Sequence, residues 1–440
     1  MQVTSLIKIN FTEGKQVFNK VFIEKILNNT NINKEKYLLT KNRLDEPVLK
    51  INLEDSTFFI NSKYNSKKEG ESFANQYYRN TKNIIVYGLG MGFHIKALAD
   101  KITPEQNLFV IECNKEIIKI ALENTDILSV FQRDNVYLIA HDTFENTMLE
   151  IKDIFLKKDM TFICHEPSVR AIPKGFEKIK DIFETYLIKV RSTNILGDLL
   201  KENEKVNLTK GYENGGKVFK DAYKNKPAII VSAGPSLEIN GEKLKNLKDK
   251  AIIISVGRAL KYLKSIGVKP DFSIITDPKE SVINQLDFDE TEISLFFLST
   301  IHPTVEKYKG PKYILFEEHS DKVSDSDKIY TVETGGSVAT TAFSLARLMG
   351  CNPLILIGQD LCYHSQKMHS GEETSFIDTK TRKTVLGIDG NYYSTPLNLY
   401  EYLKWFRKFA EKHKELKLIN CTAKGAFIEG FEHTEIDKIF

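Results

Sequence analysis

Residues 227–237, PAIIVSAGPSL, constrain the fold of this chain more than any other stretch. The continuous apolar run AIIV stops at the small residues SAG, and PS then begins a helical pattern. This order predicts a buried strand, a tight turn and a helix start. Gly234 allows the backbone to turn or to approach a ligand, and the first N–H groups of a helix suit an anion such as phosphate. A glycine turn that only joins strand to helix explains this segment alone equally well.

The same alternation of apolar runs and helical segments continues down the chain. Further strands are expected at 251–256, 271–277, 294–299, 313–316 and 353–358, and helices at 258–266 and 338–349. Helices between apolar strands predict a mostly parallel sheet that is covered on both faces. Ligands of such sheets bind beyond the carboxyl ends of the strands, so residues 232–236, Asp277 and residues 358–360 are expected along one rim.

An earlier segment carries a second strand–glycine–helix pattern. The run IIVYGLGMG (84–92) leads into a helical stretch, and the strand NLFVIE ends at Glu112, about twenty residues past the last glycine. Glycines for close backbone approach and an acid for a ribose hydroxyl are typical of a nucleotide-binding βαβ unit. The G-x-G-x-G spacing favours a methyltransferase-like unit over a nicotinamide-binding one. A relic domain that only packs or orients its neighbour is the alternative.

The fold class expected from these patterns is α/β, with two Rossmann-like parallel-sheet domains in tandem and a C-terminal helical region. The 440 residues suit two or three domains, and polar residues around the glycines 211, 215 and 216 mark the main joint. The predicted segments are an α+β segment at 1–75, a Rossmann-like domain with a connecting helix at 76–210, a central catalytic α/β domain at 226–395 and a helical region at 396–440.

Composition excludes several classes of function. With 62 basic and 59 acidic residues, the net charge of +3 provides no general attraction to nucleic acid or anionic membranes. The five cysteines are far apart and form no C-x-x-C pair, and no metal site is predicted. No apolar stretch reaches membrane-spanning length and the N-terminus lacks a secretion signal, so a cytoplasmic protein is expected. P-loop, H-E-x-x-H and G-x-S-x-G motifs are absent from the sequence.

Several polar residues lie where the predicted strands end. Asp277 follows a strand in ITDP, and ETGGSVATTA (333–342) supplies glycines and a serine at a helix start, a second place for an anion. GQDL (358–361) follows another strand. The next polar loop carries His364 and His369, either of which has the chemistry of a general base.

Taken in order, several of these segments resemble the motility accessory factor (Maf) family of bacterial flagellin glycosyltransferases. They are YGLGMGFHI (87–95), VSAGPSL (231–237), residues 255–278, residues 334–363 and the following MHSGE. The central region of that family is similar to sialyltransferases. The resemblance implies transfer of a nonulosonic acid, such as pseudaminic or legionaminic acid, from its CMP-activated form to Ser or Thr hydroxyls of flagellin.

Two alternatives remain at this point. The central domain is also similar to an archaeal 6-hydroxymethylpterin pyrophosphokinase, an enzyme that uses ATP and a divalent metal. The other is a non-catalytic flagellin-binding assembly factor with a dead nucleotide site. The extra N-terminal domain and C-terminal helices favour the glycosyltransferase, because a protein acceptor needs more surface than a pterin does.

The positions of individual residues fit roles in this glycosyltransferase reaction. Backbone N–H groups around residues 234–236, and around Gly336 and Ser337, are expected to hold the donor phosphate and carboxylate. Asp277 and Asp360 are expected to orient ribose or the sugar. One of Asp277, Asp360 or His369 takes the proton from the attacking hydroxyl. No metal is obligatory, and flagellin and the sugar nucleotide are the expected partners; the oligomeric state is left open. The expected donor-binding residues are Ser232, Gly234, Pro235, Ser236, Gly335, Gly336, Ser337 and Gln359.

Overall fold

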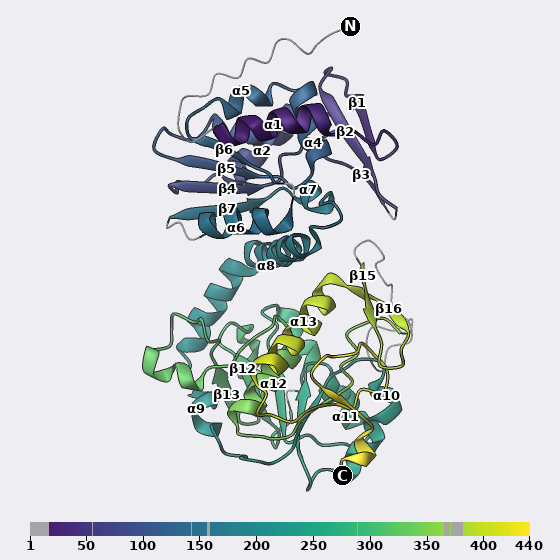
Figure 1. The fold of residues 1–440 in the computed structure, drawn as a ribbon. Coiled ribbons are helices and arrows are strands. Elements are labelled where there is room, and N and C mark those ends of the chain that lie inside the picture. Colours follow the sequence, from purple (N-terminus) through teal and green to yellow (C-terminus); the bar gives the residue numbers. More distant parts are fainter. Residues whose placement is uncertain are drawn as a thin grey trace. The chain divides into compact units, whose positions relative to one another are not determined.

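The computed structural model describes residues 17–54, 56–141, 143–155, 159–287, 289–364, 370 and 382–440. The chain divides into two compact units, Met1–Arg191 and Ser192–Phe440, and Figure 1 shows the ribbon of both. The predicted segments 1–75 and 226–395 lie in the first and second unit respectively, and the predicted joint near 211–216 lies within the second.

The first unit (unit 1) combines a small antiparallel sheet with a parallel one. The antiparallel sheet has the order β1-β2-β3, and the parallel sheet has the order β6-β5-β4-β7. The strands are β1 (Tyr37–Lys41), β2 (Pro47–Asn52), β3 (Thr57–Phe59), β4 (Asn83–Tyr87), β5 (Asn107–Ile111), β6 (Val136–Ile139) and β7 (Met160–Cys164). The helices are α1 (Val17–Asn29), α2 (Ser66–Tyr77), α3 (Phe93–Ala99), α4 (Lys115–Asn124), α5 (Ile127–Phe131), α6 (Phe144–Phe155) and α7 (Glu166–Arg170). Helix α8 (Glu177–Leu208) begins in unit 1 and ends in unit 2.

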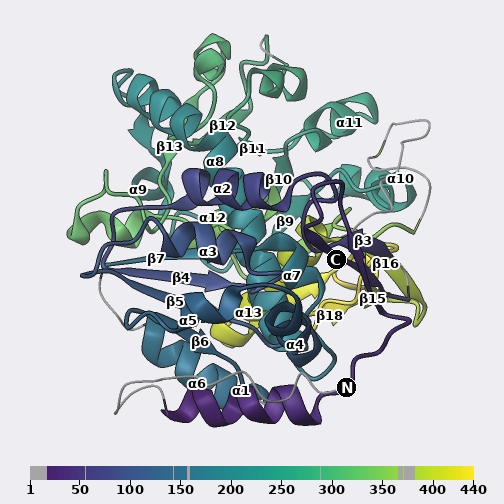
Figure 2. The same cartoon turned by 90° about the horizontal axis from the view of Figure 1, so that it is seen from above.

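Helices cover both faces of the parallel sheet in unit 1. Side chains of successive strand residues point to opposite faces, so Ile84 and Val86 of β4 pack with helices α1 to α5, whereas Ile85 and Tyr87 pack with α6, α7 and the start of α8. Helices α2 and α3 lie side by side (Figure 2). All five residues of β4 are buried, which explains why this strand reads as a continuous apolar run.

The second unit (unit 2) is built on a nine-stranded sheet in which every pairing is parallel, with the order β18-β17-β14-β9-β10-β11-β12-β13-β8. Its strands are β8 (Glu213–Asn214), β9 (Ala228–Val231), β10 (Ile252–Val256), β11 (Phe272–Ile275), β12 (Ser294–Leu298), β13 (Lys312–Leu315), β14 (Leu354–Ile357), β17 (Leu418–Asn420) and β18 (Glu432–His433). A separate antiparallel hairpin consists of β15 (Arg382–Leu386) and β16 (Tyr392–Pro396). The helices are α9 (Gly215–Phe219), α10 (Leu237–Asn240), α11 (Ala259–Ser265), α12 (Val338–Leu348) and α13 (Leu397–Lys412). Short 3-10 turns complete the unit at η1 (Gly241–Asn246), η2 (Glu280–Gln285), η3 (Pro303–Lys307), η4 (Asp325–Tyr330) and η5 (Ile436–Lys438).

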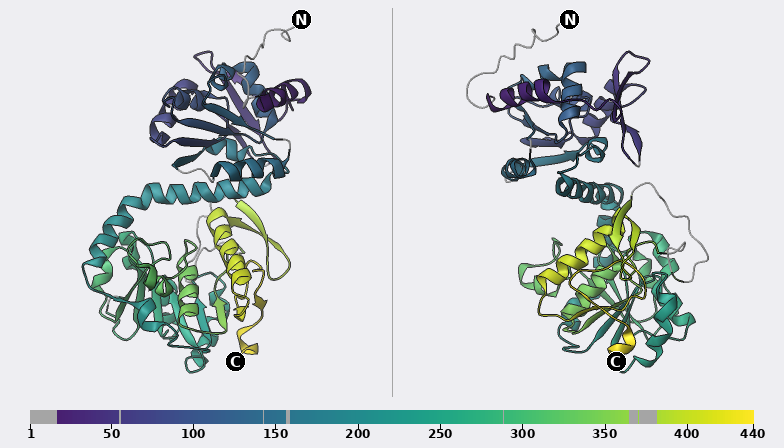
Figure 3. Two further views of the ribbon diagram at one scale, coloured as in Figure 1. Left: turned by 60° about the vertical axis from the view of Figure 1, so that its left-hand side comes forward. Right: turned by 45° about the vertical axis from the view of Figure 1, so that its right-hand side comes forward.

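The two faces of this sheet bury different helices. Ile230 of β9 belongs to a core with α12 and α13, and Ile229 and Val231 belong to a core with α10 and α11. The C-terminal segment, yellow in Figure 3, is part of this unit: α13 packs on the sheet, and β17 and β18 extend it. The α/β fold class with parallel sheets is confirmed. No helix in the described part of the chain is long and apolar enough to cross a membrane.

Candidate active site

The sheet of unit 2 has one topological switch point, and it lies at β9. Ile229 of β9 pairs with Ile253 of β10 on one side and with Ile355 of β14 on the other. The chain moves outward from β9 through β10 to β13, and then returns to the other side of β9 with β14. The connections after β9 and β14 therefore lead to helices on opposite faces of the sheet, and such a place is where open parallel sheets bind ligands. A pocket of about 260 Å³ lies there, which we call the switch-point pocket.

Six of the predicted site residues line the switch-point pocket, although they come from three separate segments. They are Ser232, Gly234, Pro235, Ser337, Gln359 and Asp360. Ser236, Asp277, Gly335 and Gly336 do not line it, and His369 lies outside the described residues. Sequence reasoning thus located the loops after β9 and β14 and the start of α12, but not every side chain within them.

Asp360 is held by three hydrogen-bond donors. Its carboxylate accepts hydrogen bonds from the Ser236 backbone N–H at 3.0 Å, from the Ser236 hydroxyl and from Nε2 of His364 at 2.7 Å. Asp360 is only 5% exposed. These three hydrogen bonds occupy acceptor positions of the buried carboxylate. Asp360 thus fixes the loop after β9 and positions His364.

The amides expected to be open to a phosphate are already hydrogen-bonded. Gly234 N–H donates to the Gly358 carbonyl at 2.9 Å, and Ser236 N–H donates to Asp360. A Cβ atom at Gly234 would lie 2.5 Å from the Gly358 oxygen, so close packing of the two loops requires glycine here. Gly234 nevertheless borders the pocket and is not sealed in the core. This turn shapes the pocket wall rather than forming a phosphate cradle with these two amides.

Helix α12 begins at the pocket. Ser337 is its N-cap residue, and the Ser337 hydroxyl accepts a hydrogen bond from Ala339 N–H at 3.2 Å. The first N–H groups of a helix have no partner within the helix itself. Gly336, at φ +82°, lets the chain turn into this helix. The positive end of an 11-residue helix therefore faces the pocket.

Gly335 and Asp277 are placed differently from the expectation. Gly335 N–H donates to the Thr340 hydroxyl, and a Cβ atom at Gly335 would lie 2.6 Å from the Trp405 ring, so this glycine serves packing. Asp277 lies just after β11, where its carboxylate accepts a hydrogen bond from Lys279 N–H at 3.0 Å. That bond is typical of a turn, and Asp277 does not reach the lining of the switch-point pocket.

Sequence reasoning missed Arg258. This exposed arginine follows β10 and is the single cationic residue among the described residues that line the pocket, where Asp360 is the single acid. Its guanidinium stays charged at every physiological pH and suits carboxylate and phosphate oxygens. The rule that found Asp360, a polar residue directly after a buried strand, applies equally to Arg258. Together with the α12 N-terminus, Arg258 makes the pocket attractive to an anion.

Gln359 is fixed between two loops. Its side-chain oxygen accepts a hydrogen bond from the Ser232 hydroxyl, and its backbone N–H donates to the Thr422 hydroxyl at 3.1 Å. These bonds join the loops after β9, β14 and β17 at the carboxyl ends of these strands. Within the residues that the structure describes, no group of three or more His, Cys, Asp or Glu residues is placed to hold a metal ion.

The glycine turn of unit 1 is filled by its own side chains. Glu112, the acid predicted to bind ribose, is 1% exposed, and its carboxylate accepts hydrogen bonds from Leu89 N–H at 3.0 Å and Asn114 N–H at 2.9 Å. A Cβ atom at Gly88 would lie 2.4 Å from the Ser168 Cβ atom. Glu112 therefore holds the turn itself, which agrees with a domain that packs rather than binds a nucleotide there.

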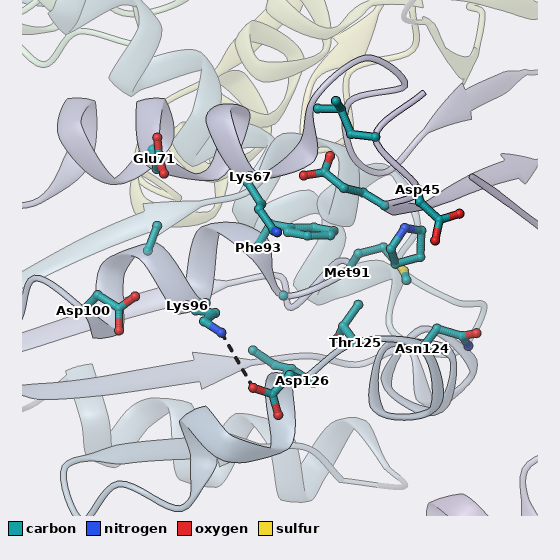
Figure 4. Close-up of a pocket in the computed structure, with 16 residues that line it drawn as sticks. Asp45, Lys67, Glu71, Met91, Phe93, Lys96, Asp100, Asn124, Thr125 and Asp126 are labelled. Carbon is teal, nitrogen blue, oxygen red and sulfur yellow. Dashed lines mark ion pairs between the residues drawn. The ribbon is translucent and has the colours of Figure 1, made fainter. Parts of the chain in front are cut away.

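A different cavity of about 500 Å³ lies beside this turn, on unit 1 (Figure 4). Met91 and Phe93 line it, and Figure 4 shows charged side chains of both signs around it, with Lys96 and Asp126 forming an ion pair at 3.7 Å. Gly88 and Leu89, which directly follow β4, are not among its described lining residues. Met91 and Gly92, the last residues of the predicted glycine turn, line the cavity, so it lies at the far end of that turn and not at the residues that directly follow β4.

Glu112 also provides a pH-dependent test of this arrangement. Burial raises the pKa of its carboxyl to about 7, from an ordinary value of 4.5. The folded unit binds a proton that the unfolded chain has already lost, so Glu112 contributes stability that is lost as pH rises from 4.5 to 7. Glu112→Gln removes this titration. The free energy of unfolding of Glu112→Gln minus that of wild type should therefore increase by roughly 2–3 kcal/mol from pH 4.5 to pH 7.5.

The measurement is urea unfolding monitored by hydrogen-exchange mass spectrometry of peptides that cover β4 and β5. The difference between wild type and Glu112→Gln isolates Glu112, because the buried histidines His94 and His165 titrate in both proteins. A stability difference that does not change with pH would show that Glu112 is not the buried, proton-binding group described above.

Two sequence-family models match separate parts of the chain. Residues 12–165 match the family described as "Glycosyltransferase Maf N-terminal domain", and residues 202–366 match the family described as "6-hydroxymethylpterin diphosphokinase MptE-like". The second match spans the loops after β9, β10 and β14 and the start of α12, and hence nearly all of the switch-point pocket.

Among solved structures, the chain is similar to one titled "Structure of MAf glycosyltransferase from Magnetospirillum magneticum AMB-1". The identity is 15%, the alignment covers 93% of this chain and 71% of that chain, and the TM-score is 0.46. A similarity of this size establishes neither a shared fold nor a shared site. No match was found among curated proteins.

Proposed function

We propose that this chain, which joins a Maf N-terminal glycosyltransferase domain to an MptE-like domain, transfers a nonulosonic acid from a CMP-activated donor to Ser or Thr hydroxyls of flagellin. The Maf match supports glycosyltransferase activity. The donor and the acceptor are the proposed part. The CMP-sugar is proposed to bind in the switch-point pocket of unit 2.

The charge of the switch-point pocket is the observation that carries this proposal. Arg258 and the N-terminus of α12 both border it, and Asp360, the one carboxylate among its described lining residues, accepts hydrogen bonds from three donors. The charges around the pocket favour a ligand with at least one negative group, such as the phosphate of a nucleotide. A CMP-activated nonulosonic acid carries one phosphate and one carboxylate, so it matches a pocket with two attractive groups.

The chemistry follows from that placement. In the transfer step, the bond between the anomeric carbon and the phosphate oxygen breaks, and a bond forms between that carbon and the acceptor hydroxyl oxygen. CMP leaves with the bonding electrons, and Arg258 and the α12 amides would stabilise the growing charge on its phosphate. The hydroxyl proton passes to a base, for which Asp277, Asp360 and His369 were predicted. Of the two candidates that the structure describes, Asp277 and Asp360, Asp360 lines the pocket, where it also positions His364.

The MptE-like match favours one alternative, transfer of pyrophosphate from ATP to a pterin alcohol. That reaction also needs an anion site at the switch point, so the pocket charge alone does not separate the two functions. Divalent metal and carboxylate ligands are usual for ATP. We favour the glycosyltransferase over the pyrophosphokinase because residues 12–165 match a glycosyltransferase domain.

Intact-mass spectrometry tests the proposed transfer. The full-length chain is incubated with flagellin from the same organism and either CMP-pseudaminic or CMP-legionaminic acid, and CMP release is followed in parallel. We expect flagellin to gain the mass of whole sugar residues, with one CMP released for each. Unmodified flagellin with both donors, together with Mg-dependent formation of AMP from ATP and hydroxymethylpterin, would replace this function by the alternative.

A further inference from the structure

Two buried histidine rings are stacked on each other in unit 1, and we call them the histidine pair. His94 belongs to α3, and His165 is the N-cap residue of α7. Their ring centroids lie 4.1 Å apart at an interplanar angle of 17°, and the two residues are only 6% and 8% exposed. The ring of Phe73 from α2 lies 5.0 Å from that of His94 and 5.9 Å from that of His165, so a third aromatic ring packs against the pair.

The histidine pair packs directly on the glycine turn that follows β4. Nε2 of His94 lies 2.8 Å from the Gly88 carbonyl oxygen, which only accepts hydrogen bonds, so the proton of the neutral ring is on Nε2. A Cβ atom at Gly90 would lie 3.2 Å from Cε1 of His165 and 3.4 Å from Cε1 of His94. The next residues of the turn, 91–93, line the cavity of Figure 4. The pair therefore supports a turn that also shapes this cavity.

One peptide group of the turn joins the histidine pair to Glu112. The Gly88 carbonyl accepts a hydrogen bond from His94, and the Leu89 N–H, which belongs to the same peptide group, donates to Glu112 at 3.0 Å. The C=O and N–H bonds of a trans peptide group point in opposite directions. His94 and Glu112 therefore hold this peptide group from opposite sides.

Little around the histidine pair would stabilise a positive charge. Within the described residues, neither ring is hydrogen-bonded to a carboxylate: His94 contacts the Gly88 carbonyl, and Nδ1 of His165 lies 2.8 Å from the Ser168 hydroxyl. Burial lowers the pKa of His94 to about 4, and burial together with the adjacent His94 lowers the pKa of His165 well below its ordinary value of 6.5. The charged side chains of α2, α3 and α7 are all exposed; they are Lys67, Lys68, Glu69, Glu71, Lys96, Glu166 and Arg170.

We propose that the histidine pair is an acid-sensitive latch, which keeps the glycine turn of unit 1 closed while both rings are neutral and lets it open locally in acid. Neutral rings stack on the turn and hold the Gly88 carbonyl. Protonation would place positive charge on rings 4.1 Å apart in a buried site without a carboxylate partner, so the opened turn binds protons that the closed turn excludes. Glu112 acts against this opening, because its buried carboxyl binds a proton in the closed state.

The linkage between protonation and opening gives the expected size of the effect. Lowering the pH from 7.5 to 5.5 raises the opening equilibrium constant about tenfold for each histidine that is protonated only in the open state, and about 100-fold for the pair. Glu112, whose pKa in the closed state is about 7, lowers that constant about 20-fold over the same range. We therefore expect an increase of about fivefold in wild type and of about 100-fold in Glu112→Gln.

Hydrogen-exchange mass spectrometry of the full-length chain measures this opening at pH 7.5 and pH 5.5, with exchange rates corrected for the intrinsic effect of pH. The reporting peptides cover residues 88–95 and 165–171, and peptides of β5 and β6 report unfolding of the whole unit. His165→Phe in the Glu112→Gln background keeps a ring in the stack that cannot be protonated, so the pH effect should fall from about 100-fold to about tenfold. His319→Gln in the same background removes a histidine of unit 2 whose side chain is 89% exposed, and it should leave the effect at about 100-fold.

The ratio of exchange at the two pH values decides the proposal. A ratio near one in Glu112→Gln overturns it, and so does a ratio in His165→Phe equal to that in the Glu112→Gln background. An equal rise in the β5 and β6 peptides also overturns it, because the whole unit then unfolds. Loss of the Ser168 contact in His165→Phe lowers stability at both pH values alike and leaves the ratio valid. If that variant does not fold, His94→Gln, which keeps an N–H donor for the Gly88 carbonyl, provides the same comparison. The latch involves only residues of unit 1, so its test is independent of the proposed function.

Discussion

Asp360→Ala should lower the stability of unit 2 by about 3 kcal/mol or more and abolish CMP binding. The substitution leaves the backbone N–H and the hydroxyl of Ser236, and Nε2 of His364, without their buried acceptor. Each buried donor left unpaired costs about 1–3 kcal/mol. The loop after β9, which forms one wall of the switch-point pocket, loses its anchor at the same time.

Tryptophan fluorescence during urea unfolding measures this effect, because Trp405 is the chain's one tryptophan and lies in unit 2. Asp249→Ala is the matched control, since it removes an exposed carboxylate from the same unit. Asp360→Asn keeps the shape and should give an intermediate loss. Equal unfolding midpoints for Asp360→Ala and Asp249→Ala would contradict the role given to Asp360.

Arg258→Ala should weaken CMP binding by about 10- to 100-fold, and it should lower stability much less than Asp360→Ala does. A hydrogen bond to a charged group contributes about 1.5–3 kcal/mol, and about 1.4 kcal/mol corresponds to a factor of ten in affinity. Arg258 is exposed, so its loss removes little packing. Arg258→Lys should retain part of the affinity, because lysine keeps the charge but not the paired N–H groups of the guanidinium.

Calorimetric titration gives the CMP affinity of each variant. Lys261→Ala is the control for general loss of positive charge, since Lys261 is an exposed residue of the neighbouring helix α11 and does not line the pocket. Loss of affinity in Lys261→Ala equal to that in Arg258→Ala would mean that long-range charge, not contact, explains the effect. Unchanged affinity in Arg258→Ala would exclude Arg258 from the site.

The strands and their order of appearance were predictable because their signal is local. Continuous apolar runs such as AIIV at β9 and LILI at β14 indicate strands buried on both faces, and the residues directly after them must lie on one rim. That reasoning placed Ser232 and Asp360 on one rim, and both line the switch-point pocket, whereas Asp277, which it placed there as well, does not.

The use of individual groups was not predictable, because it depends on contacts between distant segments. Ser236 and Asp360 are 124 positions apart, and only their meeting shows that the amide expected to bind phosphate is taken by a carboxylate. Similarly, Gly335 was interpreted as part of an anion site, whereas the Trp405 ring that it contacts comes from α13. Arg258 was missed for a local reason. It directly follows a predicted strand, but it also begins the predicted helix 258–266, and an arginine in that position is typical of a solvated helix face.

Unit 1 shows what the spacing of residues in a motif cannot decide by itself. The glycines at 88, 90 and 92 and the acid at 112 have the right spacing for a nucleotide site, and all three glycines have positive φ angles. The same features also fit a turn that is packed by its own side chains. The position of Glu112 against Leu89 distinguishes these cases, and sequence spacing carries no information on it.

Calorimetric titration of CMP into the full-length wild-type chain, in the presence of EDTA, tests the central claim most directly. The claim is that the switch-point pocket of unit 2 binds a CMP nucleotide through its negative charge without requiring a metal. We predict saturable binding at one site per chain, weakened by rising salt as expected for a charged ligand. Absence of CMP binding in EDTA, together with binding of ATP only when magnesium is added, would contradict it.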